Sequence, residues 1–395
     1  MKPRRAALSL LLLLAGPFEI VAPAFGSCSD ATFAPQVALP AGGSAQGIAV
    51  SDFNGDGDLD LAVTNFSASG AAPNHVAILL GNGHGAFGAP TQFAVGRGAT
   101  RIVVSDFNAD GPIDVAVLNS NDRTISVLLG DGQGGLGPQA TFPTGGGTVG
   151  LALGDFNGDE NDDLVVTDIF TDRITVLSGG GDGSFSALTA FPAGLGPLLV
   201  DVGDVNADGQ LDVVVDNALE PTVSIFPGNG DGTFAPQTFV PLPDGFLAQS
   251  LAVSDLDGDG ILDLVVVNAD DDTVVVFSGH GDGSFDAPAA FGVGGLPIFV
   301  AVGDLNNDRR PDLAVGNADD GTVSVLLGRG DGTFGPQTAL AVGSEPVPVA
   351  LGDFNRDGAL DMVAGNFADQ TVSVLLNECP GNRRGRRPGH TGHRR

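Results

Sequence analysis

Residues 52–60 read Asp-Phe-Asn-Gly-Asp-Gly-Asp-Leu-Asp, and this stretch decides how the rest of the chain is interpreted. The pattern Asp-apolar-Asn/Asp-x-Asp-Gly-x-x-Asp recurs seven times, twice with the glycine replaced. Its copies begin at Asp52, Asp106, Asp155, Asp204, Asp255, Asp304 and Asp353. A period of about 50 residues without 3.6-residue apolar spacing excludes helical solenoids. It also excludes the calcium β-roll, whose nine-residue repeats follow one another directly.

Four short strand-like runs accompany each acidic stretch. In the fifth repeat, run 250–254 precedes the acidic residues, and runs 262–267 and 273–277 follow them. A Gly-rich turn at 279–283 leads into a fourth run that begins at Ser284. The second run is nearly all apolar, which predicts a strand covered on both faces. The fourth run carries proline in five repeats, and because proline cannot donate to a sheet ladder, we expect this run at the outer edge.

Seven four-stranded units of this kind predict an all-β fold, a closed seven-bladed β-propeller that spans residues 27–380. An extra fourth-type run at 32–36 precedes the first repeat, and the last repeat stops after its third run, 371–376. We therefore expect the N-terminal strand to complete the last blade. Cys28 and Cys379, the two cysteines of the chain, lie where that blade lacks its Gly-rich turn. A disulfide between them would replace the turn, and two free thiols are the alternative.

The repeated nonapeptide has the donor set that Ca²⁺ prefers. Positions 1, 3, 5 and 9 carry side-chain oxygens, position 7 can offer a backbone carbonyl, and glycine at position 6 permits a sharp turn. Position 12 is not glutamate in the first or fifth loop, and no helical pattern flanks the loops, which excludes an EF-hand. One such loop could be an ordinary Asx-rich turn, but seven in register favour calcium. The expected ligands of the five intact loops are Asp52, Asn54, Asp56, Asp60, Asp106, Asn108, Asp110, Asp114, Asp204, Asn206, Asp208, Asp212, Asp255, Asp257, Asp259, Asp263, Asp353, Asn355, Asp357 and Asp361.

Two loops depart from the pattern, and the sequence leaves open whether they bind calcium. The third has Glu160 in place of glycine, and the sixth has Arg309 there, followed by Arg310. We expect turn strain at Arg309 and the weakest binding in the sixth loop, where either arginine could partly replace the cation. The corresponding ligands are Asp155, Asn157, Asp159, Asp163, Asp304, Asn306, Asp308 and Asp312.

The charge distribution restricts the partners. The 395 residues include 48 acidic and 17 basic side chains, for a net charge of −31. The acidic residues occupy the repeats, whereas many of the basic ones gather at the two ends. A strongly acidic body repels nucleic acid and anionic membranes and suits divalent cations. We expect the Arg-rich tail, 381–395, to be disordered.

The N-terminal sequence resembles an export signal. A basic start at Lys2, Arg4 and Arg5 precedes an apolar run at 6–15, and Ala22-Pro23-Ala24 offers a cleavage site. We predict a signal peptide over 1–24, with an unremoved N-terminal anchor as the alternative. No later segment has 18 unbroken apolar residues, so we expect no membrane span. The expected location is secreted, periplasmic or on the cell surface, where a disulfide can form.

The chain resembles the FG-GAP/VCBS repeat proteins, which include the propeller of the integrin α-subunit. The resemblance rests on the Asp-Phe-Asn-Gly-Asp-Gly loops, on Phe87-Gly88-Ala89-Pro90 and on the Gly-Asp-Gly-Thr-Phe turns that begin at Gly230 and Gly330. It covers about residues 31–377. It implies calcium in the acidic loops and extracellular adhesion or ligand binding. In integrins the ligand face lies opposite the calcium loops, a face that here would carry segments 268–272 and 317–320.

We therefore expect a secreted, monomeric calcium-binding module for adhesion or protein interaction, whose partner is an extracellular protein or a cell-surface polymer. A lectin on the same fold is the first alternative, disfavoured because the chain lacks the Trp and Tyr on which sugar rings stack. A secreted enzyme is the second alternative, since paired carboxylates can perform acid–base chemistry. The carboxylates are already explained as repeated ligands, and no Ser/His/Asp or Cys/His set stands out. We therefore expect no catalytic residues.

Overall fold

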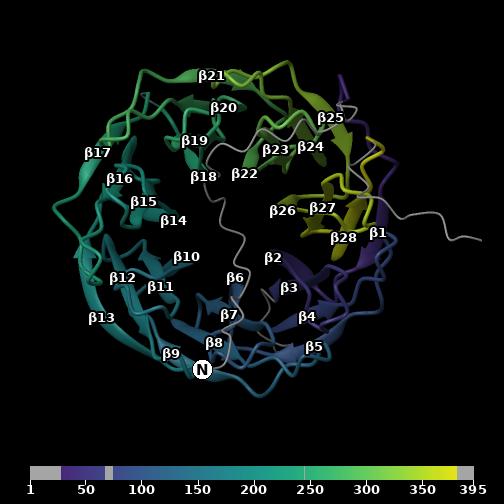
Figure 1. Ribbon diagram of the computed structural model, residues 1–395, viewed down its shortest axis with the longest axis horizontal. Coiled ribbons are helices and arrows are strands. Elements are labelled where there is room, and N and C mark those ends of the chain that lie inside the picture. The colour runs from purple at the N-terminus through teal and green to yellow at the C-terminus, as the bar shows by residue number, and fades with distance from the viewer. Residues whose placement is uncertain (1–27, 67–73, 244, 380–395) are drawn as a thin grey trace, which may run out of the picture.

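The computed structural model describes residues 28–66, 74–243 and 245–379. Within these residues, 28 β-strands form seven four-stranded antiparallel sheets arranged as blades around a ring (Figure 1). This confirms the all-β class and the seven-bladed propeller. None of the described residues belongs to a helix that could cross a membrane. The predicted signal peptide, 1–24, and the predicted tail, 381–395, lie outside the described residues.

Six blades take their four strands from consecutive sequence. Blade 1 contains β2 (Ser44–Ser51), β3 (Asp60–Phe66), β4 (His75–Leu79) and β5 (Thr91–Ala94), and blade 2 contains β6 (Ala99–Ser105), β7 (Asp114–Asn119), β8 (Thr124–Leu128) and β9 (Ala140–Pro143). Blade 3 contains β10 (Thr148–Gly154), β11 (Asp163–Asp168), β12 (Arg173–Gly179) and β13 (Phe185–Pro192), and blade 4 contains β14 (Pro197–Gly203), β15 (Asp212–Asn217), β16 (Thr222–Phe226) and β17 (Thr238–Pro241). Blade 5 contains β18 (Ala248–Ser254), β19 (Asp263–Asn268), β20 (Thr273–Phe277) and β21 (Ala289–Gly292), and blade 6 contains β22 (Pro297–Gly303), β23 (Asp312–Asn317), β24 (Thr322–Leu326) and β25 (Thr338–Ala341).

The order of strands within each blade follows from composition. The first strand faces the centre of the ring (Figure 1), and the second strand is buried at every residue except Phe66. The fourth strand lies at the outer edge, as the prolines predict, and in six blades it begins only after a proline. Blade 3 has no proline there, and its fourth strand, β13, accordingly extends over eight residues instead of four.

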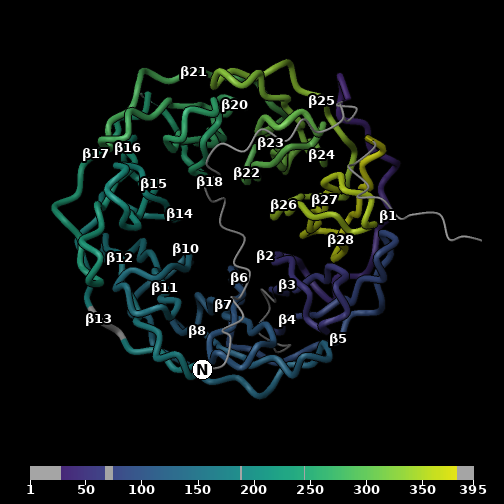
Figure 2. Tube along the Cα trace, viewed as in Figure 1, coloured from purple at the N-terminus to yellow at the C-terminus, as the bar shows by residue number. Residues whose placement is uncertain are grey.

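Blade 7 combines both ends of the described chain. It contains β26 (Pro346–Gly352), β27 (Asp361–Asn366), β28 (Thr371–Leu375) and β1 (Val37–Pro40). Strand β1 pairs antiparallel with β28, with Val37 opposite Val374, and Figure 2 shows the purple N-terminal strand beside the yellow last blade. Cys28 and Cys379 form the predicted disulfide across a sequence separation of 351.

The closing strand begins later than the sequence predicts. Within the expected run 32–36, Phe33 forms an isolated bridge with Asn377, and the continuous strand starts at Val37. Pro35 interrupts the ladder because it has no N–H to donate. Ser373 bonds the side chain of Gln36, as Ser126 bonds Gln139 in blade 2, so the N-terminal segment occupies the position of a fourth strand.

Hydrophobic contacts join each blade to the next. One core cluster combines Phe53 and Ala62 of blade 1 with Val115 and Val117 of blade 2. The recurring phenylalanines of the Gly-rich turns pack across these junctions, onto position 2 of the acidic loop in the preceding blade. The ring pairs are Phe87–Phe354 at 5.4 Å, Phe107–Phe185 at 5.5 Å and Phe156–Phe234 at 5.9 Å.

Candidate metal centres

All seven acidic loops join the first strand of a blade to its second strand, so they lie on one face of the ring, here called the acidic-loop face. Position 9 of each loop is the first residue of the second strand, as Asp60 is of β3. The Gly-rich turns between third and fourth strands share this face, whereas the connections between second and third strands and between blades lie on the opposite face. The fold therefore brings every predicted ligand to one side of the molecule.

The aspartate at position 9 has a structural role that the sequence analysis did not predict. Asp60 is fully buried, and its Oδ2 accepts a hydrogen bond from the N–H of Phe53 at 2.9 Å. Its Oδ1 accepts one from the N–H of Gly81, in the Gly-rich turn, at 2.7 Å. The same two bonds recur in all seven blades, with Asn377 as the second donor in blade 7. In blades 2 to 7 that donor follows the aspartate by 16 residues, a spacing that could have identified it.

Burial also changes the acidity of these carboxyls. It raises the pKa of Asp114, Asp163 and Asp361 to about 6 and that of Asp312 to about 7, against the opposing effect of the two backbone hydrogen bonds. The charges of positions 1 and 5 add to the rise. Each oxygen keeps a second lone pair, so the carboxylate can still bind a cation. A cation there would offset the cost of ionising the buried group.

The side chains at positions 1, 3 and 5 accept hydrogen bonds from backbone N–H groups of the same loop. In the first loop, Asp52 accepts the N–H of Gly55 through Oδ1 and that of Gly57 through Oδ2, each at 2.8 Å. Asn54 Oδ1 accepts the N–H of Asp56 at 2.9 Å. These bonds are Asx turns, the alternative interpretation of a single loop. They give the loop its shape and also gather its side-chain oxygens.

Position 6 has a left-handed backbone in every loop, as the repeated glycine predicts. The two replacements adopt it as well, with φ of 70° at Glu160 and 68° at Arg309. A left-handed residue other than glycine costs about 1–2 kcal/mol, so the sixth loop carries the strain expected at Arg309 and the third loop carries it as well. Position 4 is left-handed too, which the sequence analysis missed, and at this position it includes residues such as Ala109 and Arg356.

The fifth loop has the densest set of carboxylates. One oxygen each from Asp255, Asp257 and Asp263 lies within 4.8 Å of the others, the one such His/Cys/Asp/Glu group in the described part of the chain. In the first and second loops, position 3 is asparagine, whose amide donates to the position-5 carboxylate at 3.0 and 2.9 Å. A carboxylate at position 3 cannot donate. Burial, together with the charges of Asp259 and Asp255, raises the pKa of Asp257.

The sixth loop has the same fold but different surroundings. Among the described residues, neither Arg309 nor Arg310 forms an ion pair with the carboxylates of the loop. Arg310 extends along the Gly-rich turn instead, where a Cβ on Gly330 would lie 3.0 Å from its Cδ. The closing segment covers position 3, because the N–H of Cys28 donates to the carbonyl of Asn306 at 3.0 Å.

The seventh loop reaches its neighbour across the ring closure. Arg356, at position 4, donates from Nη2 to the carbonyl of Asp56 at 3.2 Å and pairs through Nε with Asp58. Both acceptors belong to the first loop. A cationic side chain therefore already lies beside that candidate centre.

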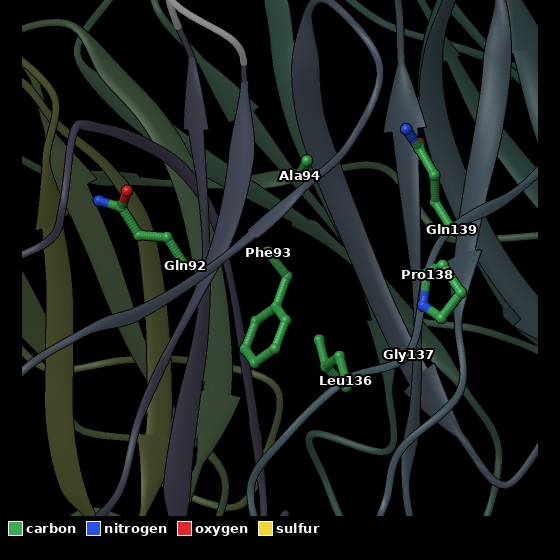
Figure 3. A pocket seen from close by; sticks show the side chains of 7 residues that line it. All are labelled: Gln92, Phe93, Ala94, Leu136, Gly137, Pro138 and Gln139. Carbon is green, nitrogen blue, oxygen red and sulfur yellow. The ribbon is translucent and has the colours of Figure 1, made fainter.

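A pocket lies away from these loops, at the outer rim between blades 1 and 2. Figure 3 shows Phe93 of β5 beside Leu136, which precedes β9, with Pro138 and Gln139 nearby. The seven lining residues include no acid, base, serine or cysteine. This pocket offers no group for acid–base or nucleophilic chemistry.

Solved structures with unrelated activities share the fold. The chain is similar to BBS1N, solved in complex with ARL6DN, with 12% identity, a TM-score of 0.63, and 89% of this chain and 99% of that chain covered. A periplasmic gluconolactonase of Pseudomonas aeruginosa has 18% identity and a TM-score of 0.60, covering 81% and 88% of the two chains. An Agrocybe aegerita lectin specific for terminal N-acetylglucosamine has 19% identity and a TM-score of 0.53, covering 85% of each. At these identities the likeness shows the fold alone.

Sequence comparison identifies the family. No curated protein sequence matches the chain. The FG-GAP-like repeat matches it five times, at residues 106–166, 155–215, 218–266, 255–315 and 304–364, which together make up more than half of the chain. The chain belongs to the FG-GAP-like repeat family, as the acidic loops and Gly-rich turns predict.

Proposed function

We propose that the chain is a secreted calcium-binding β-propeller that acts as an adhesion or protein-interaction module. The observation that carries the proposal is the fifth loop, where three carboxylates bring their oxygens within 4.8 Å of one another. Calcium prefers hard oxygen donors at about 2.3–2.6 Å, and carboxylates supply both the donors and the charge. Six further loops repeat the same hydrogen-bonded turn, so the proposal extends to a ring of related centres.

The proposed secreted location is consistent with the proposed role of a calcium-binding interaction module. The Cys28–Cys379 bond is typical of chains that fold outside the reducing cytosol. Extracellular calcium modules bind in the range of about 10⁻⁴–10⁻³ M, which matches millimolar calcium outside cells. We infer that calcium neutralises the acidic-loop face and stabilises the ring, which then presents its opposite face to a partner.

Calorimetry of the mature chain tests the calcium proposal. A cation that binds only the folded state stabilises it by mass action, so Tm should rise with calcium and fall on chelation with EGTA. Magnesium at the same concentration should raise it less, because Mg²⁺ demands a stricter octahedral site. The control is Asp182→Asn, which removes one exposed charge from a Gly-rich turn and should leave the calcium effect unchanged. Equal Tm values in calcium and EGTA would refute the proposal.

A further inference from the structure

Three large apolar side chains are exposed on neighbouring loops of blades 3 and 4, on the face opposite the acidic loops. Phe170 is 78% exposed, Leu219 is 70% exposed and Leu195 is 51% exposed. Phe170 and Leu219 each lie between the second and third strands of a blade, and Leu195 lies in the connection between the two blades. We call these three residues the apolar platform. Single exposed apolar residues are ordinary, but three large ones on adjoining loops of one face indicate an interaction site.

Hydrogen bonds donated by backbone N–H groups hold the loops of the platform together. The N–H of Leu219 donates to the carbonyl of Leu195 at 3.1 Å. The N–H of Leu195 donates to the Glu220 carboxylate at 3.1 Å, and the N–H of Gly196 donates to the carboxylate of Asp172, two residues after Phe170, at 2.8 Å. The loops that present the three side chains are therefore fixed to one another. A surface that is ordered before binding loses less entropy when a partner docks.

Comparison of the repeats shows that the apolar platform departs from the residue types found at the same positions in other blades. The position of Phe170 and Leu219, two residues after the second strand, is occupied by Asn121, Asp270 and Asp319 in blades 2, 5 and 6. Polar residues therefore satisfy the fold at this position. The loop conformation does not require phenylalanine or leucine there, so their presence calls for another explanation.

On one side of the platform, blades 5 to 7 are acidic on the same face, whereas blade 2, on the other side, carries the exposed Arg97 and Arg123 there. The loops at 269–272, 318–321, 343–346 and 367–370 all carry exposed carboxylates, and none of them contains a basic residue. Blade 5 adjoins blade 4, so the first acidic loop of this set follows the platform directly around the ring. A complementary surface would therefore be apolar over blades 3 and 4 and positively charged over blades 5 to 7.

We propose that this face docks a polypeptide segment of a partner protein that places an aromatic or aliphatic side chain on the apolar platform and lysine or arginine side chains over the acidic loops of blades 5 to 7. This inference rests on the proposed interaction function and specifies the chemistry of the partner. Large apolar and aromatic side chains are the usual anchors of protein interfaces, and complementary charges at the rim set the orientation.

A random twelve-residue peptide library displayed on phage tests the proposal. The calcium-loaded chain serves as bait, and the Phe170→Ser/Leu219→Ser variant is used for counter-selection. Enriched peptides should combine a large apolar residue with an excess of Lys and Arg. They should bind the double variant at least tenfold more weakly, and should bind Phe239→Ser, a control at an exposed rim phenylalanine, like the wild type. Failure to enrich, enrichment of acidic peptides, or equal loss with the control would overturn the proposal.

The charge component has its own test, on one synthetic peptide from the selection. Asp270→Asn/Asp319→Asn should weaken binding at least threefold and reduce its salt dependence, whereas Asp182→Asn/Asp231→Asn, on the acidic-loop face, should change neither. An equal effect of both pairs would overturn the charge assignment. Sedimentation of the wild type as a dimer and of the platform variant as a monomer would assign the platform to self-association, against the proposal. Calcium-dependent melting of each variant is measured separately, so a failure of the calcium proposal can be distinguished from a failure of the docking proposal.

Discussion

The fifth and sixth acidic loops share hydrogen bonds at positions 1 and 9 but differ at position 3 and in charge. At position 3, the Asn306 amide donates to Asp308 at 3.1 Å, which the carboxylate of Asp257 cannot do. In both, position 1 accepts the N–H of position 6, at 3.0 Å for Asp255 and 2.8 Å for Asp304. In both, the position-9 aspartate accepts two backbone N–H groups. Loop 255–263 carries four carboxylates and no base, whereas loop 304–312 carries three carboxylates and two arginines. The comparison indicates that positions 1 and 9 determine the shape of the loop, and we propose that positions 3, 6 and 7 adjust its affinity for a cation.

The largest expected effect concerns the disulfide, both of whose cysteines contact Asn306 of the sixth loop. We expect Cys28→Ser/Cys379→Ser to lower the free energy of unfolding by about 3–5 kcal/mol, because the bond closes a very long loop in the unfolded chain. Urea unfolding under non-reducing conditions measures this. Amide exchange should increase near Asn306, which accepts the N–H of Cys28, and should not change in the fifth loop. An unchanged unfolding midpoint would show that the strand pairing of β1 closes the ring alone.

The second-largest expected effect is the loss of stability when the position-9 aspartate is removed, and it should be equal in the fifth and sixth loops. Replacing Asp263 or Asp312 with alanine leaves two buried N–H groups without an acceptor, at a cost of about 2–4 kcal/mol in either loop. Because this role is structural, the loss should appear in EGTA as well as in calcium. Asp282→Ala, in an exposed Gly-rich turn, is the control and should cost far less. A loss seen only in calcium would mean that position 9 acts as a ligand and not as a structural acceptor.

The fifth and sixth loops should differ in their affinity for calcium. We expect Asp257→Asn to weaken binding at the fifth loop about tenfold, because one carboxylate ligand becomes a neutral amide. The reverse change, Asn306→Asp, should strengthen binding at the sixth loop, although the nearby arginines should keep it weaker than the fifth. Isothermal titration of the variants against wild type measures both changes. If both substitutions left the titration unchanged, position 3 would not contribute to binding.

The sequence was sufficient to predict the fold, because its information is repeated. Seven copies of one acidic pattern, apolar second runs and prolines in the fourth run all indicate the same blade. The closing strand was placed too early, since Pro35 prevents regular pairing until Val37. The role of position 9 was missed because its donors, such as Gly81, lie in a different turn that only the folded blade brings close. The apolar platform was missed because its residues come from separate loops, and no single repeat shows them together.

The smallest expected effect isolates the strain at position 6. Arg309→Gly relieves a left-handed arginine but adds flexibility to the unfolded chain, so the net gain should be about 0.5–1 kcal/mol. It also removes a positive charge beside the sixth loop, so calcium should bind that loop more tightly. Glu160→Gly, at the same position of the third loop, is the matched control: it relieves similar strain but removes a negative charge. Both variants should therefore gain stability in EGTA, whereas only Arg309→Gly should gain calcium affinity. If the two substitutions changed calcium affinity equally relative to wild type, position 6 would act through backbone shape alone, and any effect of charge on the affinities of the fifth and sixth loops would come from positions 3 and 7.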